Sequence, residues 1–168
     1  MELRPLRHSD GAALDAIFRD SQVKRMLPPR VRRETGVQFT ARVLGENRRR
    51  DGYAFAVRWL GTPEAIGLIR LRNWSHEERS AEVGYWIRRR DWGRGAGSEA
   101  LHLVCRFGFR SMRLHRIVAN VVAGNTRSIR TLEGAGFRQE GKRRLSARVS
   151  RGWADELEFG LLRADWTG

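Results

Sequence analysis

Hydrophobic residues alternate with polar ones in some segments of the chain and recur at helical spacing in others, which predicts both strands and helices. Alternating or continuous apolar segments predict strands at residues 2–6, 53–59, 65–71, 81–87 and 115–122. The rest of the chain, at residues 137–149 and 153–162, is interpreted as two final strands. Apolar residues three and four positions apart predict a first helix through Leu14, Ile17 and Phe18, a second from about residue 34 to 49, and a third through Leu101, Val104, Cys105 and Phe109. A short fourth helix is expected from Asn125 through Ile129 and Leu132. This order predicts an α/β (α+β) fold, with a mixed sheet and one domain over residues 1–168.

Residues that favour helix ends and turns mark the boundaries of these elements. Ser9 and Asp10 are expected to cap the first helix, and Asn125 is expected to cap the last one. The pair at residues 28–29 is Pro-Pro, which breaks the chain between the first two helices. Cys105 falls on the apolar side of the third helix with Leu101 and Val104, so we expect it in the core.

The composition excludes several classes of protein. The 168 residues are 40% hydrophobic and include six Trp and seven Phe, which is too apolar for a disordered chain. One cysteine excludes an intramolecular disulfide framework and a multi-cysteine zinc module. No run approaches 18 apolar residues, and the first residues lack the apolar stretch of a signal peptide. We therefore expect a soluble cytoplasmic protein that does not act at a membrane.

Positive charge is concentrated in the middle of the chain. Lys and Arg number 33 against 19 Asp and Glu, a formal net charge of +14. Residues 88–151 contain 16 basic and 4 acidic residues, so this segment alone has a net charge of +12. Such an excess indicates a polyanionic ligand, an acidic partner or a solvated arginine-rich surface.

A glycine-rich loop is the clearest candidate for ligand chemistry. Residues 92–100 read Trp-Gly-Arg-Gly-Ala-Gly-Ser-Glu-Ala, between a predicted strand and a predicted helix. Glycines allow backbone N–H groups to approach an anion, and the N-terminus of a helix attracts a phosphate. The loop lacks the Lys-Ser/Thr pair of a Walker motif, and no β-α-β unit follows that would make it a dinucleotide fingerprint.

Two blocks of sequence give this loop a family resemblance. Residues 81–87 (Ala-Glu-Val-Gly-Tyr-Trp-Ile) followed by the loop form the first block. The second is Gly-Asn-Thr-Arg-Ser at 124–128 with Leu-Glu-Gly-Ala-Gly-Phe at 132–137. Together they resemble the GNAT N-acetyltransferases, and among them the Rim-type branch that includes ribosomal-protein N-terminal acetyltransferases. The resemblance implies a mostly antiparallel sheet of six to seven strands with about four helices, acetyl-CoA as acetyl donor, and no metal.

The resemblance also implies which residues bind the donor. The loop would hold the pyrophosphate of CoA, the end of the preceding strand would pair with the pantetheine arm through its backbone, and the Asn of the second block would bind a pantetheine amide. The residues assigned in this way are Trp86, Ile87, Arg88, Trp92, Gly93, Arg94, Gly95, Ala96, Gly97, Ser98 and Asn125.

Two residues are catalytic candidates. The resemblance places Ser128 near the sulfur as a hydrogen-bond or proton donor, although it also fits an ordinary serine in the first turn of a helix. Glu82 shares a strand face with Gly84 and Trp86 and is the candidate base, the alternatives being an arginine partner or a water chain. Neither Tyr53 nor Tyr85 matches the tyrosine that many GNAT enzymes use as the acid.

The expected acceptor is a primary amine, most simply the α-amine of a protein N-terminus. An α-amine, with a pKa of about 7.7–8.0, is roughly a tenth deprotonated near neutrality, whereas a lysine amine at about 10.4 is almost fully protonated. A small amine remains an alternative acceptor. A non-catalytic module that binds the ribosome or RNA is the alternative from another class. A ribosomal or other acidic partner and a homodimer are further expectations.

Overall fold

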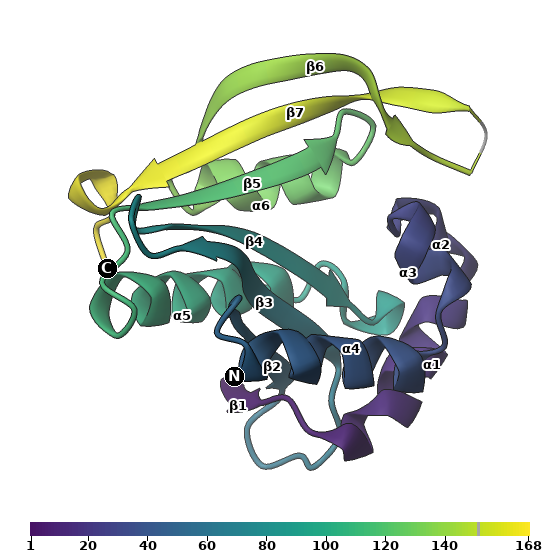
Figure 1. Ribbon diagram of the computed structural model, residues 1–168. Helices are drawn as coiled ribbons and strands as arrows, with labels where there is room; N and C mark the ends of the chain where they lie inside the picture. The colour runs from purple at the N-terminus through teal and green to yellow at the C-terminus, as the bar shows by residue number, and fades with distance from the viewer. Residues whose placement is uncertain (151) are drawn as a thin grey trace.

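The computed structural model describes residues 1–150 and 152–168, which build one seven-stranded sheet (Figure 1). In spatial order the strands are β1 (Glu2–Pro5), β2 (Tyr53–Arg58), β3 (Gly67–Ser75), β4 (Ser80–Ile87), β5 (Arg116–Val122), β7 (Trp153–Leu162) and β6 (Arg138–Arg148). β4 and β5 are parallel, and every other pair of neighbours is antiparallel. The predicted strands and the mixed, mostly antiparallel sheet are confirmed.

The described residues form six α-helices where the sequence predicted about four. They are α1 (Gly11–Arg19), α2 (Ser21–Met26), α3 (Pro29–Arg33), α4 (Gly36–Arg48), α5 (Ala96–Arg110) and α6 (Thr126–Gly134). The extra helices are short pieces between the predicted first and second helices. Asp20 starts α2 by accepting hydrogen bonds from the N–H groups of Gln22 and Val23. None of the helices in residues 1–150 and 152–168 is long and apolar enough to cross a membrane.

Asn125 and Asp10 were both expected to cap helices, and only Asn125 makes the expected hydrogen bond from its side chain. Asn125 caps α6, because its Oδ1 atom accepts a hydrogen bond from the Ser128 N–H at 3.3 Å. Asp10 occupies the N-cap position of α1, as predicted, but its side chain makes no capping hydrogen bond to that helix. Its carboxylate accepts from the Arg7 N–H at 2.8 Å and pairs with Arg4, so it closes a preceding 3-10 turn at His8–Asp10.

Helices cover both faces of the sheet, and each face has its own hydrophobic cluster. Leu68 of β3 packs with the cluster under α1–α4, whereas its neighbour Ile69 packs with the cluster under α5 and α6. This division follows from the alternation of side chains along a strand. Cys105 of α5 is buried in the second cluster, and burial raises the pKa of its thiol to about 12, which agrees with its predicted place in the core.

The parallel strands β4 and β5 separate soon after they meet. They pair only at Ser80–Arg116, Ala81–Ile117 and Glu82–Val118, and then diverge (Figure 1). On the side of β4 that faces β5, residues 83–87 therefore have no neighbouring strand and lie beside a gap. Antiparallel partners continue on the outer sides of both strands, so the sheet splays open without losing its continuity.

The C-terminal hairpin of β6 and β7 extends past the rest of the sheet (Figure 1). β6 is the edge strand, and most of its residues are exposed. Several of its basic side chains lie against acidic side chains of β7. Lys142 pairs with Asp155 at 2.7 Å, and Arg143 pairs with Glu156 and Glu158 at 2.7 and 2.9 Å. Part of the basic excess in residues 88–151 is thus offset by acids close to it in space.

Candidate active site

Two cavities meet at the gap between β4 and β5. One, of about 620 Å³, is bounded by residues of the glycine loop and the first turns of α6, and we call it the glycine-loop cavity. The other, of about 790 Å³, lies on the α2–α4 side and contains many arginines, so we call it the arginine-lined cavity. Five residues line both: Met26, Tyr85, Trp86, Asn125 and Ser128. A ligand in one cavity can therefore reach a ligand in the other at these residues.

The glycine loop is shaped to receive an anion. Gly93 and Gly95 have φ angles of 76° and 79°, a conformation that favours glycine, and a Cβ atom at either would meet nothing within 4 Å. Gly95 is the N-cap residue of α5, and no side chain caps the helix there. The first N–H groups of α5 are therefore available to a ligand, and the helix dipole favours negative charge at this point. These features fit the phosphates of a nucleotide-containing ligand.

A buried carboxylate holds the start of the loop. Asp91 is 1% exposed and accepts hydrogen bonds from Trp59 Nε1 at 2.9 Å, Arg88 Nε at 2.8 Å and Arg94 Nη1 at 3.2 Å. Burial opposes ionisation of Asp91, but the hydrogen bonds from Trp59 and Arg88 outweigh it and hold the pKa below its ordinary value. The side chains of Arg88 and Arg94 are thus engaged in positioning the loop, and neither residue lines the glycine-loop cavity.

Trp92 joins the loop to the sheet and to α6. Its Nε1 atom donates a hydrogen bond to the Ile87 carbonyl oxygen at 2.7 Å. The Arg127 guanidinium lies 4.2 Å from the centre of a Trp92 ring, a cation–π contact. Arg127 and Arg130 of α6 both line the cavity. They are the basic residues among those that line the cavity, and they were not among the residues selected from sequence.

The register of β4 shows which backbone groups face the gap. The Arg88 N–H donates to the Ile66 carbonyl oxygen at 2.7 Å, beside the register pair Gly67–Ile87. Backbone groups in an antiparallel pair point alternately toward and away from the partner strand. Those of Trp86 and Arg88 therefore face β3, and those of Tyr85 and Ile87 face the gap. Trp86, Ile87 and Arg88 were expected to pair with a ligand through their backbone groups. Of these three, only Ile87 has backbone groups that face the gap, and Tyr85 is a second residue whose backbone groups face it.

Two hydroxyl groups lie together where the cavities meet. The Tyr85 hydroxyl and the Ser128 Oγ atom are 3.0 Å apart, within hydrogen-bond distance. Burial raises the pKa of the Tyr85 phenol above its ordinary value, against the opposing effect of hydrogen bonds with Ser128 and Thr131. Tyr85 therefore keeps its proton at neutral pH and can donate it to Ser128. Tyr85 was not predicted as a site residue from sequence, because it does not match the position of the tyrosine that many GNAT enzymes use as the acid.

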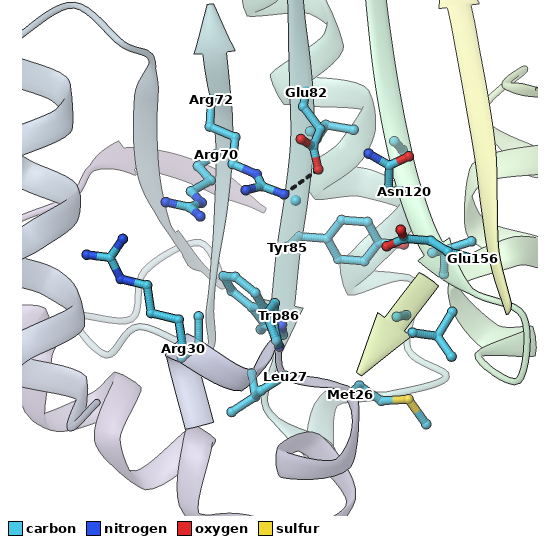
Figure 2. A pocket seen from close by; sticks show the side chains of 18 of the residues that line it. Met26, Leu27, Arg30, Arg70, Arg72, Glu82, Tyr85, Trp86, Asn120 and Glu156 are labelled. Atoms are coloured by element: carbon cyan, nitrogen blue, oxygen red, sulfur yellow. Dashed lines mark hydrogen bonds and ion pairs between the residues drawn. The ribbon is translucent and has the colours of Figure 1, made fainter. Parts of the chain in front are cut away.

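Glu82 lies in the arginine-lined cavity, where Figure 2 shows its contact with Arg72, and it is held by two donors. Arg72, its register partner on β3, pairs with the Oε1 atom, and Asn73 Nδ2 donates to Oε2 at 3.0 Å. The alternative interpretation of Glu82, as the partner of an arginine, is therefore observed. The same carboxylate shares a cavity with Tyr85 and Ser128, so a role in proton transfer is compatible with this contact.

Most of the residues selected from sequence lie around the two cavities. Those that line the glycine-loop cavity are Trp86, Ile87, Trp92, Gly93, Gly95, Ala96, Gly97, Ser98, Asn125 and Ser128. Arg88 and Arg94 lie behind the loop, and Glu82 lies in the arginine-lined cavity. Arg70 also lines that cavity and was not selected. An arginine inside the apolar run of residues 65–71 was the signal that could have drawn attention to it.

Solved structures of acetyltransferases share this fold. RimJ of Mycobacterium smegmatis, solved in complex with CoA-disulfide, superposes with a TM-score of 0.86 at 29% identity, covering 96% of this chain and 81% of that one. Spermidine N-acetyltransferase of Vibrio cholerae, solved with CoA and spermine, gives a TM-score of 0.87 at 19% identity, covering 98% and 96%. The second similarity, at this low identity, concerns the fold alone.

Sequence comparisons place the chain in the same group. The ribosomal protein uS5-alanine N-acetyltransferase of Escherichia coli is 31% identical over 109 residues, which cover 62% of this chain and 56% of the relative. The chain spans little more than half the length of the curated relatives that it matches. The family described as the acetyltransferase (GNAT) domain matches residues 1–138. The chain belongs to the GNAT acetyltransferase family.

Proposed function

We propose that this protein is an acetyl-CoA-dependent N-acetyltransferase and that its acceptor is the α-amine of a protein N-terminus. The observation that carries the proposal is the meeting of the two cavities at Tyr85 and Ser128. An anion-binding loop lies on one side of this junction, and a separate cavity, open to an acceptor, lies on the other. Two substrates can thus enter from opposite sides and react where both are in reach.

Acetyl-CoA would lie along the glycine-loop cavity. The N–H groups of Gly95, Ala96 and Gly97 would bind the pyrophosphate, and Ser98 would add a hydroxyl donor from the first turn of α5. Asn125 caps α6 through Oδ1, so its Nδ2 atom is a donor for a pantetheine amide. The CoA-disulfide bound by RimJ of Mycobacterium smegmatis supports this choice of ligand.

The chemistry requires two proton transfers. Acetyl-CoA supplies the acetyl group as a thioester, so a new C–N bond forms as the C–S bond breaks. The acceptor nitrogen loses a proton and the departing sulfur gains one. We assign the donor to Ser128 Oγ, with the Tyr85 phenol donating to Ser128 in turn. Glu82, or water beside it, accepts the proton of the amine.

The acceptor class rests on charge and on relatives. Seven arginines and four carboxylates are among the described residues of the arginine-lined cavity, which disfavours a polyamine. The similar enzyme of Escherichia coli is named for the alanine of a ribosomal protein. An α-amine also suits a site with one carboxylate base, because part of it is already unprotonated near neutral pH.

Glu82→Gln is expected to lower kcat/KM for a peptide about tenfold to a hundredfold at pH 7, with much of the loss recovered at pH 9. The amide cannot accept a proton, but the acceptor amine loses its own proton as the pH rises. Initial rates across pH 6–9.5 measure this. Asn73→Ala is the control, because it removes a hydrogen bond from Glu82 and keeps the carboxylate. If the pH profile of kcat/KM in Glu82→Gln equals that of the wild type, Glu82 is not the base and acts only as the partner of Arg72.

A panel of acceptors tests the proposed function. Peptides with free and with blocked N-termini, an internal lysine, free amino acids and spermidine would each be incubated with the protein and acetyl-CoA. Thiol release and mass spectrometry report transfer and its position. We expect acetylation of free peptide N-termini, and none of blocked peptides or spermidine.

Other outcomes of the panel lead to the alternative functions. Acetylation of small amines alone would contradict the protein acceptor and keep the enzyme. If no acceptor is acetylated while RNA is retained with a steep dependence on salt, the protein is a binding module. Acetyl-CoA binding without transfer to any acceptor would remove the catalytic assignment of Ser128 and Glu82.

A further inference from the structure

Arg70 is a buried cation with little compensation. It belongs to β3, is 6% exposed, and its guanidinium lies 5.6 Å and 5.9 Å from ring centres of Phe39 and Trp86. Its Nη1 atom donates to Glu46 Oε2 at 3.0 Å, and its buried Nε atom has no partner in the described part of the chain. A buried charged group is stable when it is paired and its hydrogen bonds are satisfied, so Arg70 is short of an acceptor.

The side chains around Arg70 do not supply that acceptor. Arg30, Arg42 and Arg70 form a network with Glu34 and Glu46, and Glu82 pairs separately with Arg72, so arginines outnumber carboxylates here. Glu46, the one carboxylate on Arg70, also pairs with Arg42 at 2.7 Å. Burial, and next the charge of Arg72, lowers the pKa of Arg70 to about 10, so it remains charged at neutral pH.

Open space lies beside this network. Gly84 is the register partner of Arg70 on β4, and a Cβ atom at Gly84 would meet nothing within 4 Å. Its neighbours on the same strand face are Glu82 and Trp86, so the space is bordered by Arg70, by the Arg72–Glu82 pair and by the Trp86 indole. In Figure 2, Arg30, Arg70 and Arg72 come from one side of the cavity and Asn120 and Glu156 from the other.

We propose that the acceptor carries a carboxylate close to its reacting amine, and that Arg70, supported by Arg72, binds this carboxylate in the space over Gly84. The proposal rests on the proposed function and narrows its acceptor. A guanidinium is suited to a carboxylate, and the cation–π contacts with Phe39 and Trp86 hold the Arg70 side chain in place. The amine of the same molecule then lies toward Tyr85 and Ser128, at the meeting of the cavities.

Two sources could provide the carboxylate: an acidic side chain within the first residues of a peptide, or the carboxyl group of a free amino acid. Peptides with Asp at residue one, two or three, each matched to the same peptide with Asn, test the first. Free amino acids matched to their amides test the second. For wild-type protein we expect kcat/KM to be tenfold to a hundredfold higher for the acid than for the amide in at least one pair.

Arg70→Met should remove this preference. The ratio of acid to amide is expected to fall below about twofold, while transfer to the amide acceptor persists, because the variant loses the charge and keeps an apolar chain against Phe39 and Trp86. Arg49→Met is the control. Arg49 lines the same cavity but is exposed and pairs with Asp51 at 3.1 Å, so the ratio should remain as in wild type. Acetyl-CoA binding by each variant checks that it is folded, and Arg70→Gln, which is also uncharged, replaces Arg70→Met if that variant fails the check.

Calorimetry with the same acceptors and CoA-saturated protein separates this proposal from the proposed function. Equal kcat/KM for acids and amides in wild type, or retention of the preference by the Arg70 variant, would overturn the carboxylate site and leave the enzyme in place. Tighter binding of acids without any transfer would support the site and contradict the proposed function. Transfer to spermidine ahead of every acidic acceptor would contradict the carboxylate site.

Discussion

Gly95→Glu is expected to weaken acetyl-CoA binding by a hundredfold or more, the largest loss among the substitutions considered. Gly95 ends the loop at the N-terminus of α5, where backbone N–H groups would bind the pyrophosphate. A carboxylate there opposes the phosphate charge, and like charges brought together cost several kcal/mol. The new side chain also requires a φ of 79°, which costs roughly 1–2 kcal/mol outside glycine. Isothermal titration calorimetry measures the loss.

Gly61→Glu separates the two causes. Gly61 has a φ of 75° and open space around it, as Gly95 does, but it lies in the turn between β2 and β3 and lines neither cavity. We expect both variants to lose similar thermal stability and only Gly95→Glu to lose acetyl-CoA binding. Equal affinity in Gly95→Glu and wild type would show that the donor binds elsewhere.

Ser128→Ala is expected to lower kcat about a hundredfold with little change in acetyl-CoA affinity. The hydroxyl that would protonate the departing sulfur is lost, and general acids commonly contribute 10²–10⁴ to a rate. The cap of α6 survives, since Asn125 accepts its hydrogen bond from the Ser128 backbone N–H, which alanine retains. Rapid-quench measurement of a single turnover reports the chemical step.

Tyr85→Phe tests the second hydroxyl. It should lower the same rate about tenfold, because Ser128 would lose its own donor at 3.0 Å. In the double variant the loss should equal that of Ser128→Ala, since Tyr85 acts only through Ser128. Tyr53→Phe, at a tyrosine packed against Trp74 and Phe107, should be neutral. If Ser128→Ala keeps the wild-type single-turnover rate, Ser128 has only a structural role in α6. If the losses of the two single variants add up in the double variant, Tyr85 acts independently of Ser128.

The strands were predictable because their patterns are local. Most of them contain β-branched or aromatic residues close to turn residues, although β1 and β6 contain none, and all seven appear in the sheet. The helices between residues 11 and 48 were harder to predict. Their boundaries depend on single caps, such as Asp20 at α2 and Thr35 at α4, within a stretch that is helical almost throughout. Asp10 shows the same difficulty, because Arg4, on another element, competes for its carboxylate.

The site was predictable where it consists of a contiguous motif. The glycine loop and the turn at Asn125 both line the expected cavity. Arg70 and Tyr85 were missed because their roles depend on neighbours distant in sequence: Glu46 for the first, and Ser128 for the second. Arg94 shows the opposite case. A basic residue inside the motif is turned toward Asp91 and Trp59, behind the loop.

The divergence of β4 and β5 assigns the two substrates to different parts of the molecule. Under the proposed function, the donor is held by the glycine loop, α5 and α6. The acceptor is surrounded by α2–α4 and by the face of β3 and β4 that carries Arg70 and Gly84. Only a few residues at the junction serve both. The choice of acceptor can therefore be redesigned by replacing side chains such as Arg70 and Gly84, while the residues that hold the donor stay unchanged. The part of the fold that binds the donor can thus stay constant while the part that binds the acceptor changes.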